Sequence, residues 1–230
     1  MRVEPYGLDS IVHAVKRGAR GFDIVKDEND RKDFVNLLFH VNETYNSTHW
    51  RRELTSLPQF TRPSDWPERK PLVEILGWTL MPNHFHLILK SLVEGGIAKF
   101  MQRLCGSMSL TFNLKYGGTG SIFQGGYKGR VVDGEADLRY LTSYVLVKNV
   151  FELLPGGLEQ SMQAFEKAWK AAGEYPYSSF ATLAFGLPSP IVEIDILREL
   201  FTTPDQFKQD SFDMLDAYVE HNRDTDLFLE

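Results

Sequence analysis

The spacing of hydrophobic positions divides the first half of the chain into short extended runs and one amphipathic helix. Residues 8–21 alternate apolar and polar side chains before a Gly-rich basic turn, which predicts a strand followed by a loop. Residues 27–45 carry apolar side chains at helical spacing, which predicts a helix. Two apolar runs, 72–80 and 84–90, flank the sequence "MPN", which indicates two strands joined by a turn or bulge.

The second half is predominantly helical by the same criterion. Residues 94–118 predict a helix that ends at two glycines, and residues 121–132 return to an extended pattern. Residues 134–154 predict another helix, which ends before the sequence "PGG". Three further helical segments are predicted at 158–173, 191–201 and 203–221.

This order predicts an α+β sandwich, with one sheet covered by helices on one face and a helical C-terminal subdomain after it. We place the boundary near residue 150, so that 1–150 form the first domain and 151–230 the second. Residues 46–71 contain four prolines and no periodicity, which predicts a long exposed loop or insertion.

The charge of the chain is unevenly distributed. Residues 1–150 carry 20 Lys and Arg against 16 Asp and Glu, a net +4, and residues 151–230 carry 5 against 15, a net −10, which together give the overall −6. This asymmetry predicts a mildly basic body and an acidic C-terminal portion.

A single cysteine, Cys105, excludes a disulfide within the chain and argues against a cysteine-based zinc site. No apolar run approaches the ~20 residues of a membrane span, so a cytoplasmic location without a membrane partner is expected.

Two histidines, His84 and His86, stand one residue apart in an apolar run. On a strand, residues i and i+2 point to the same face, so the two imidazoles would lie side by side while Phe85 points to the opposite face. Such a pair is either two hydrogen-bonded core histidines or two ligands of a divalent cation. Two imidazoles do not complete a site, and a mixed set of imidazole and oxygen ligands would suit Mg²⁺ or Mn²⁺ acting on a phosphate.

Two tyrosines on the helix predicted at 134–154 are candidates for a nucleophile. Tyr140 and Tyr144 are four residues apart, so they share one face of the helix. A phenol can form covalent intermediates when a cation polarises the group it attacks. The alternative is that both are core tyrosines of an amphipathic helix.

These motifs together resemble the HUH single-tyrosine transposases, and more narrowly the REP-associated tyrosine transposases of the IS200-like family. The resemblance covers roughly residues 8–186 and rests on stretches that occur in the family's order: "HAVKRGARGFDIVKDENDRKDFVNLL", "LMPNHFHLILK", "GSIFQGGYKGRVV", "LTSYVLVKNV" and "GEYPYSSFATLAFG". It implies a ferredoxin-like sandwich with an antiparallel sheet. It also implies that His84 and His86 bind Mg²⁺ or Mn²⁺, and that Tyr144 cleaves single-stranded DNA through a 5′-phosphotyrosine intermediate.

The chain departs from the family's pattern directly after the nucleophile. Family members place Asn or Gln four residues after the tyrosine, where it can complete the metal site, but here Lys148 holds that position and Asn149 follows. A protonated ammonium cannot bind a metal. Three interpretations follow: Asn149 replaces the ligand after a small helical adjustment, Lys148 contacts the scissile phosphate, or cleavage is weakened or lost.

The resemblance implies a partner of single-stranded or hairpin DNA, such as REP-like inverted repeats, bound by a monomer or homodimer near the nucleoid. We expect the phosphates to be contacted by basic residues near two glycine-rich turns and by one on the nucleophile's helix, namely Lys16, Arg17, Arg20, Lys128, Arg130 and Lys148. We expect the acidic C-terminal portion either to occlude the active site or mimic DNA, or simply to pack on the core. The alternative function is a domesticated hairpin-binding protein whose cleavage is weakened or lost.

Overall fold

The computed structural model describes residues 6–45, 47, 49–54 and 57–227. The described elements follow the predicted order of strand, helix, two strands, helix, strand and then helices. The strands are β1 (Ile11–Arg17), β2 (Val73–Leu80), β3 (His84–Ser91) and β4 (Lys128–Val131). The helices before β4 are η1 (Ala19–Gly21), α1 (Glu28–His40), α2 (Trp50–Leu54) and α3 (Gly96–Tyr116). Those after β4 are α4 (Gly134–Ser143), η2 (Tyr144–Lys148), α5 (Asn149–Leu153), α6 (Gly157–Gln163), α7 (Phe165–Gly173), α8 (Phe180–Phe185), α9 (Asp195–Leu200) and α10 (Pro204–Leu227).

The four strands form one sheet in the order β2-β3-β1-β4. Strand β1 pairs antiparallel with β4, with Val12 opposite Val131 and Val15 opposite Lys128. With the long helix α1 between β1 and β2 and the long helix α3 between β3 and β4, this order is that of a ferredoxin-like βαββαβ unit. The prediction of an α+β fold is confirmed.

The contacts of the chain divide it into two compact units, which are described separately. The first contains residues 1–74, 82–84 and 89–131, and the second contains residues 75–81, 85–88 and 132–230. The second unit therefore includes the helix of Tyr144 together with all later helices and the middle of β2 and β3. No helix in the described part of either unit is long and apolar enough to cross a membrane.

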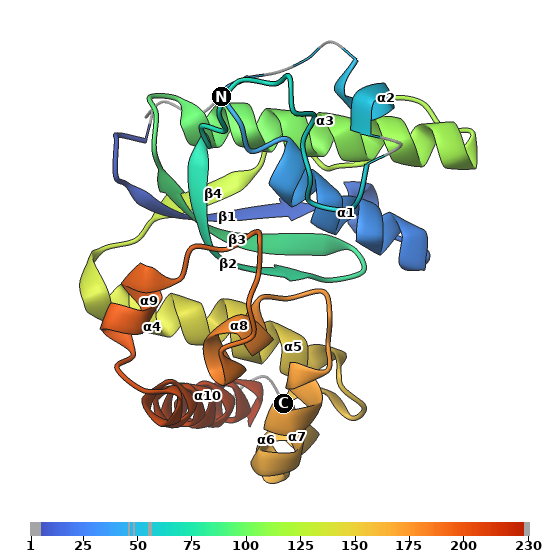
Figure 1. The fold of residues 1–230 in the computed structure, drawn as a ribbon. Coiled ribbons are helices and arrows are strands. Elements are labelled where there is room, and N and C mark those ends of the chain that lie inside the picture. Colours follow the sequence, from blue (N-terminus) through green and yellow to red (C-terminus); the bar gives the residue numbers. More distant parts are fainter. Residues whose placement is uncertain (1–5, 46, 48, 55–56, 228–230) are drawn as a thin grey trace. The chain divides into compact units, whose positions relative to one another are not determined.

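In the first unit, α1 and α3 lie on the same side of β1 (Figure 1). Helix α1 begins with a capping box, in which the Asp27 side chain accepts from the backbone of Asn29 and Asp30, and Asp30 accepts in return from Asp27. Lys115 of α3 donates to Asp27 and Asp30 at 2.6–2.7 Å, which joins the end of α3 to the start of α1. The hydrogen bond from Lys115 lowers the pKa of Asp27 to about 2.

The segment 46–71, predicted as an exposed loop, contains one short helix and internal polar contacts where it is described; residues 46, 48, 55 and 56 lie outside the described part. Arg62 forms an ion pair with the buried carboxylate of Glu43. Trp66 donates to Glu53 of α2 at 2.8 Å. Arg62 and Trp66 are therefore engaged with protein carboxylates.

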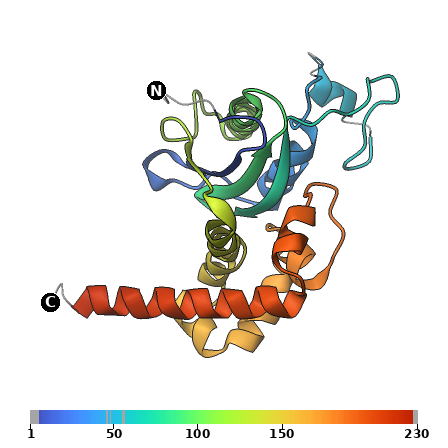
Figure 2. The ribbon, with the colours of Figure 1, turned by 90° about the vertical axis from the view of Figure 1, so that its left-hand side faces the viewer.

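In the second unit, the acidic C-terminal portion packs on the helix of Tyr144. Figure 2 shows α10 as one long helix. Ser211 of α10 exchanges a buried hydrogen bond of 2.9 Å with Ser143, and Asp210 pairs with Arg139 at 2.8 Å. The side chain of Leu215 is fully buried. This corresponds to the simpler of the two expectations, a helical module that packs on the core.

Three local features differ from the pattern-based prediction. The helix predicted at 158–173 is interrupted at Ala164, whose φ and ψ are −124° and 46°, so that two helices form. Helix α8 was not predicted. The helix predicted at 134–154 contains a π turn, η2, which helical periodicity alone does not reveal.

The burial of α10 predicts a large stability loss from a single truncation. Leu215→Ala should lower the free energy of unfolding by about 2–5 kcal/mol, because it removes a fully buried side chain. Urea unfolding measures the loss, and the neighbouring exposed Asp216→Ala, expected to stay within about 0.5 kcal/mol, is the matched control. Equal behaviour of the two variants would contradict the packing of α10.

Candidate active site

The two predicted metal ligands lie on β3. His84 is half-buried, and its Nδ1 atom lies 2.6 Å from the side-chain oxygen of Asn83. Because that oxygen can only accept, Nδ1 is the donor in this hydrogen bond. A second-sphere hydrogen bond of this kind is typical of histidines that bind metals.

His86 is buried and lies against the predicted nucleophile. Its ring centroid is 5.7 Å from that of Tyr144, with the two planes at 68°. The ring of Tyr140 stacks on that of Tyr144, with a centroid distance of 6.4 Å and an interplanar angle of 19°. Tyr140 is 45% exposed whereas Tyr144 is half-buried, and the ring contact with His86 is made by Tyr144.

Tyr144 begins the π turn η2. The backbone N–H of Asn149 donates to the carbonyl of Tyr144, five residues earlier. In a regular α-helix that carbonyl would receive the N–H of the fourth residue, which here is Lys148. The extra residue in the turn therefore gives Asn149 the backbone position that the fourth residue occupies in an α-helix. Single π turns of this kind occur frequently at functional sites.

A hydrogen bond from β2 holds the wider turn. The hydroxyl of Thr79, which is fully buried, donates to the carbonyl of Val145 at 2.6 Å. A Cβ atom added to Gly77 of β2 would lie 3.4 Å from the side chain of Leu146, which is also within the turn. The turn is therefore in close contact with this strand. The conformation of η2 thus depends on β2 as well as on its own sequence.

The side chain of Asn149 is buried and incompletely hydrogen-bonded. It is 1% exposed, and its Nδ2 atom has no hydrogen-bond partner in the described part of the chain. The two ends of an amide are interchangeable by a rotation of the group, so the unfilled position is equally available to its oxygen. A buried amide without a partner costs about 1–3 kcal/mol, which favours a function other than packing.

Lys148, by contrast, is fully engaged. Its ammonium is 2.6 Å from the carboxylate of Glu152 and lies over the rings of Tyr144 and Tyr218, at 4.9 Å and 5.4 Å from their centroids. Burial lowers the pKa of Lys148, but the hydrogen bond to Glu152 and the nearby Tyr144 oxygen outweigh it and leave the pKa above its ordinary value. The ammonium is therefore charged and directed to protein groups.

The strand pair β1–β4 carries the remaining predicted DNA contacts. Along β1, Val12, Ala14 and Lys16 are buried, and the alternate residues point to the more exposed face. His13 is opposite Arg130, and Val15 is opposite Lys128, and paired residues share a face. Both β4 cations therefore lie on the face of β1 that ends in the exposed Arg17, and we call this the basic face.

Lys16 lies on the opposite side of β1 from the basic face. Its ammonium donates to the carbonyl of Gly125 and is 5.3 Å from the ring centroid of Phe123. Burial lowers the pKa of Lys16. Of the predicted phosphate contacts, the structure thus places Arg17, Arg20, Lys128 and Arg130 at exposed positions, and Lys16 and Lys148 at buried ones.

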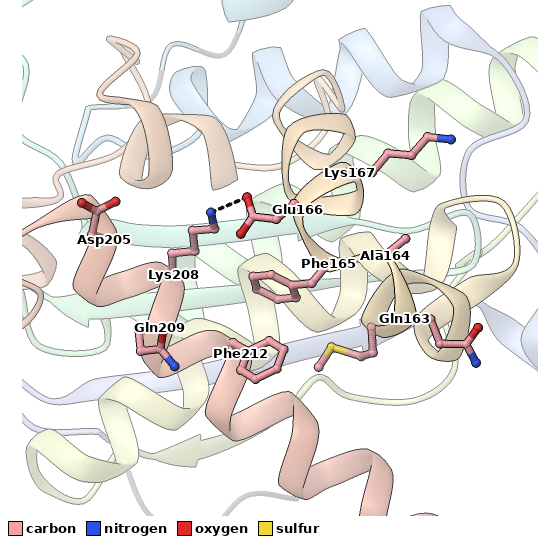
Figure 3. Close-up of a pocket in the computed structure, with 10 residues that line it drawn as sticks. Gln163, Ala164, Phe165, Glu166, Lys167, Asp205, Lys208, Gln209 and Phe212 are labelled. Carbon is pink, nitrogen blue, oxygen red and sulfur yellow. Dashed lines mark hydrogen bonds and ion pairs between the residues drawn. The ribbon is translucent and has the colours of Figure 1, made fainter.

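A separate cavity lies in the second unit between the α6–α7 junction and α10 (Figure 3). It has a volume of about 730 Å³, and Phe165 and Phe212 are among its lining side chains. An ion pair of 2.7 Å between Lys208 and Glu166 crosses it. None of the predicted site residues lines this cavity. Among the described residues there is also no cluster of three or more His, Cys, Asp or Glu side chains that could hold a metal.

Comparison with known families identifies the segment that contains the histidines and the tyrosine. Residues 68–147 match the family model described as "Transposase IS200 like". This segment is similar to the IS200-like transposases. The match includes His84, His86 and Tyr144 and ends directly before Lys148.

Other comparisons add little. A search of curated proteins finds no match. The solved structure described as "Structure of the REP associates tyrosine transposase bound to a REP hairpin" is similar at 15% identity and a TM-score of 0.42, over 85% of this chain and 92% of that chain. A similarity at this level supports no conclusion about the present protein.

Several residues of the IS200-like site were not predicted from the sequence. Asn83 orients His84, Thr79 supports the π turn, and Glu152 and Tyr218 hold Lys148. The spacing of Lys148 and Glu152, four residues apart on a helix, was a signal for their ion pair. Tyr218 had no such signal because its contact joins positions distant in sequence.

The incomplete hydrogen bonding of Asn149 predicts that stability and function can be separated there. Asn149→Leu should change the free energy of unfolding by less than about 1 kcal/mol, or raise it, because it removes a buried amide without a complete set of partners. Thermal or urea unfolding measures the effect.

The matched control is Asn42→Leu. Asn42 is also buried, but its amide donates to the carbonyl of Val73 at 2.8 Å and accepts from the backbone of Leu72 and Val73 at 3.0 Å. Its loss should cost about 2–5 kcal/mol. A comparable loss in Asn149→Leu would show that Asn149 is a structural residue.

Proposed function

We propose that this protein is a metal-dependent, single-stranded DNA transposase or endonuclease of the HUH type, which cleaves and rejoins hairpin-bearing DNA through Tyr144. The observation that carries the proposal is the contact between His86 and Tyr144 at a π turn whose next residue is the buried, incompletely hydrogen-bonded Asn149. These residues lie within, or directly after, the IS200-like segment.

The donor set fits a divalent metal. His84 and His86 are two residues apart on β3, and the hydrogen bond of His84 to Asn83 is of the kind that orients metal-binding histidines. Asn149 would add an amide oxygen, and a mixed set of imidazole and oxygen ligands suits Mg²⁺ or Mn²⁺. When bound, the metal would supply Lewis-acid polarisation of the scissile phosphate.

Tyr144 would carry out the covalent step. Its phenolic oxygen would form a bond to the phosphorus while the bond from phosphorus to the 3′-oxygen breaks. The phenol proton is lost and the leaving 3′-oxygen gains one, so a 5′-phosphotyrosine and a free 3′-hydroxyl result. Attack of a 3′-hydroxyl on the phosphotyrosine reverses these changes and rejoins the strand.

Lys148 would support this step without serving as a ligand. Its ammonium lies over the ring of Tyr144, where positive charge favours the negative charge that develops on the phenolic oxygen. Its ion pair with Glu152 engages the ammonium within the protein. We therefore favour Asn149 as the replacement ligand over direct contact of Lys148 with the scissile phosphate.

The alternative function is a hairpin-binding protein of the same family that has lost cleavage. The observation that favours it is Lys148 itself, since the family's expected ligand is absent from the fourth position after Tyr144. Both functions predict DNA binding by the basic face in the cytoplasm, by a monomer or homodimer. They differ only in the covalent intermediate.

The covalent intermediate provides the test. Incubation with a labelled single-stranded hairpin oligonucleotide and Mn²⁺ should give a protein–DNA adduct that resists denaturing electrophoresis. Tyr144→Phe should abolish the adduct, because the attacking oxygen is removed, and addition of a chelator should abolish it in the wild-type protein. Tyr140→Phe is the matched control and should retain the adduct, because it removes a hydroxyl from the ring stacked on Tyr144 and leaves the proposed attacking oxygen in place.

Two results would contradict the proposal in different ways. Tight hairpin binding without any adduct would support the alternative function. An adduct that persists in Tyr144→Phe and disappears in Tyr140→Phe would show that Tyr140, and not Tyr144, is the nucleophile.

The basic face predicts the salt dependence of hairpin binding. The double variant Lys128→Ala/Arg130→Ala should bind more weakly, and the slope of log K against log[salt] should decrease by about 2, because two phosphate contacts are lost. A salt titration by fluorescence anisotropy measures the slope. Lys115→Ala removes a cation that is already paired with Asp27 and Asp30, so its slope should equal that of the wild type. Equal slopes in all three proteins would remove the basic face from the interface.

A further inference from the structure

The turn after β1 exposes an aromatic ring between two cations. Phe22 follows the short helix η1 and is 67% exposed, one of the most exposed large hydrophobic side chains described. Arg17 and Arg20 are exposed on the same turn. Neither arginine has a hydrogen bond or ion pair with another described side chain, and the only carboxylate within the turn is that of Asp23. The turn therefore combines an uncovered ring with net positive charge.

The turn is held in one conformation by the backbone. Arg20 has a φ of 56°, a left-handed conformation that costs free energy for a residue other than glycine. A Cβ atom at Gly18 would lie 2.0 Å from the carbonyl oxygen of Phe22, so only glycine allows the chain to fold back at this point. The exposure of Phe22 thus belongs to a defined turn.

The same turn is attached to the segment that precedes the first histidine. The N–H of Gly18 donates to the carbonyl of Asn83 at 2.7 Å, and the N–H of Ile24 donates to the carbonyl of Pro82 at 2.8 Å. The side chain of Asn83 contacts both sides, since its Nδ2 donates to Gly21 at 3.4 Å and its oxygen accepts from His84. Phe22 is therefore held next to the strand end from which His84 projects, and all of these residues belong to the first unit.

We infer that Phe22 is a stacking platform for an unpaired base of the DNA close to the scissile phosphate, with Arg17 and Arg20 binding the phosphates on either side of that base. This inference rests on the proposed function for the class of ligand. An aromatic ring flanked by cations is the combination that binds single-stranded nucleic acid, because every base offers a π-face and the backbone offers charge at each nucleotide. Arg17 is at the end of the basic face, so a DNA strand could follow cations from β1 and β4 to the turn.

The test compares two DNA ligands and three variants in the Tyr144→Phe background, which binds DNA without consuming it. One ligand is a hairpin with an unpaired single-stranded flank, and the other is the same hairpin with a blunt end. Phe22→Ala should weaken binding of the flanked hairpin by about 5- to 100-fold, the effect of losing one stacked base, and should leave binding of the blunt hairpin unchanged. Phe22→Trp should restore the affinity for the flanked hairpin, because the larger ring also stacks.

Leu114→Ala is the matched control, since Leu114 is a 78% exposed apolar residue of the same unit that lies outside the turn. It should affect neither ligand. An equal loss for both ligands in Phe22→Ala, or no loss for either, would overturn the inference, as would a change from dimer to monomer on gel filtration that accounts for the loss. If the parent protein binds neither ligand, the proposed function itself fails, and that result is distinct from a failure of the stacking platform.

Discussion

The candidate site depends on one backbone hydrogen bond, from the N–H of Asn149 to the carbonyl of Tyr144. This bond spans five residues instead of four, so the turn contains one additional residue. Lys148 and Asn149 therefore have different surroundings. Lys148 is directed to Glu152 and Tyr218, and Asn149 takes the backbone position that an α-helix would give to the fourth residue. Under the proposed function, the extra residue of this turn would account for Lys148 at the position where a ligand was expected.

The π turn is stable because other elements support it. The hydroxyl of Thr79 from β2 donates a hydrogen bond to the carbonyl of Val145. Tyr218 of α10 provides one of the rings over which the Lys148 ammonium lies. The acidic C-terminal portion is bound to the helix of Tyr144 through Ser211, Asp210 and buried apolar side chains. A large deletion there would remove the support of the nucleophile.

Periodicity was sufficient for the strands and for the main helices, since each of these follows from local spacing. It was not sufficient for the π turn, because the turn depends on Thr79, more than sixty residues earlier in the sequence. Successive residues of β1 point to opposite faces, so Lys16 and Arg17 cannot both face the solvent. The burial of Lys16 could therefore have been predicted from the same alternation that predicted the strand. The unpartnered amide of Asn149 could only be found from coordinates.

The central claim is that Asn149, and not Lys148, completes the metal site beside Tyr144. The most direct measurement is a crystal structure of the protein soaked with Mn²⁺, with anomalous diffraction recorded at the manganese absorption edge. The account predicts a single anomalous peak within bonding distance of His84, His86 and the Asn149 amide, with the turn from Tyr144 to Lys148 in its π conformation. A regular α-helix at this point, or manganese bound by the histidines with Asn149 outside bonding distance, would contradict it.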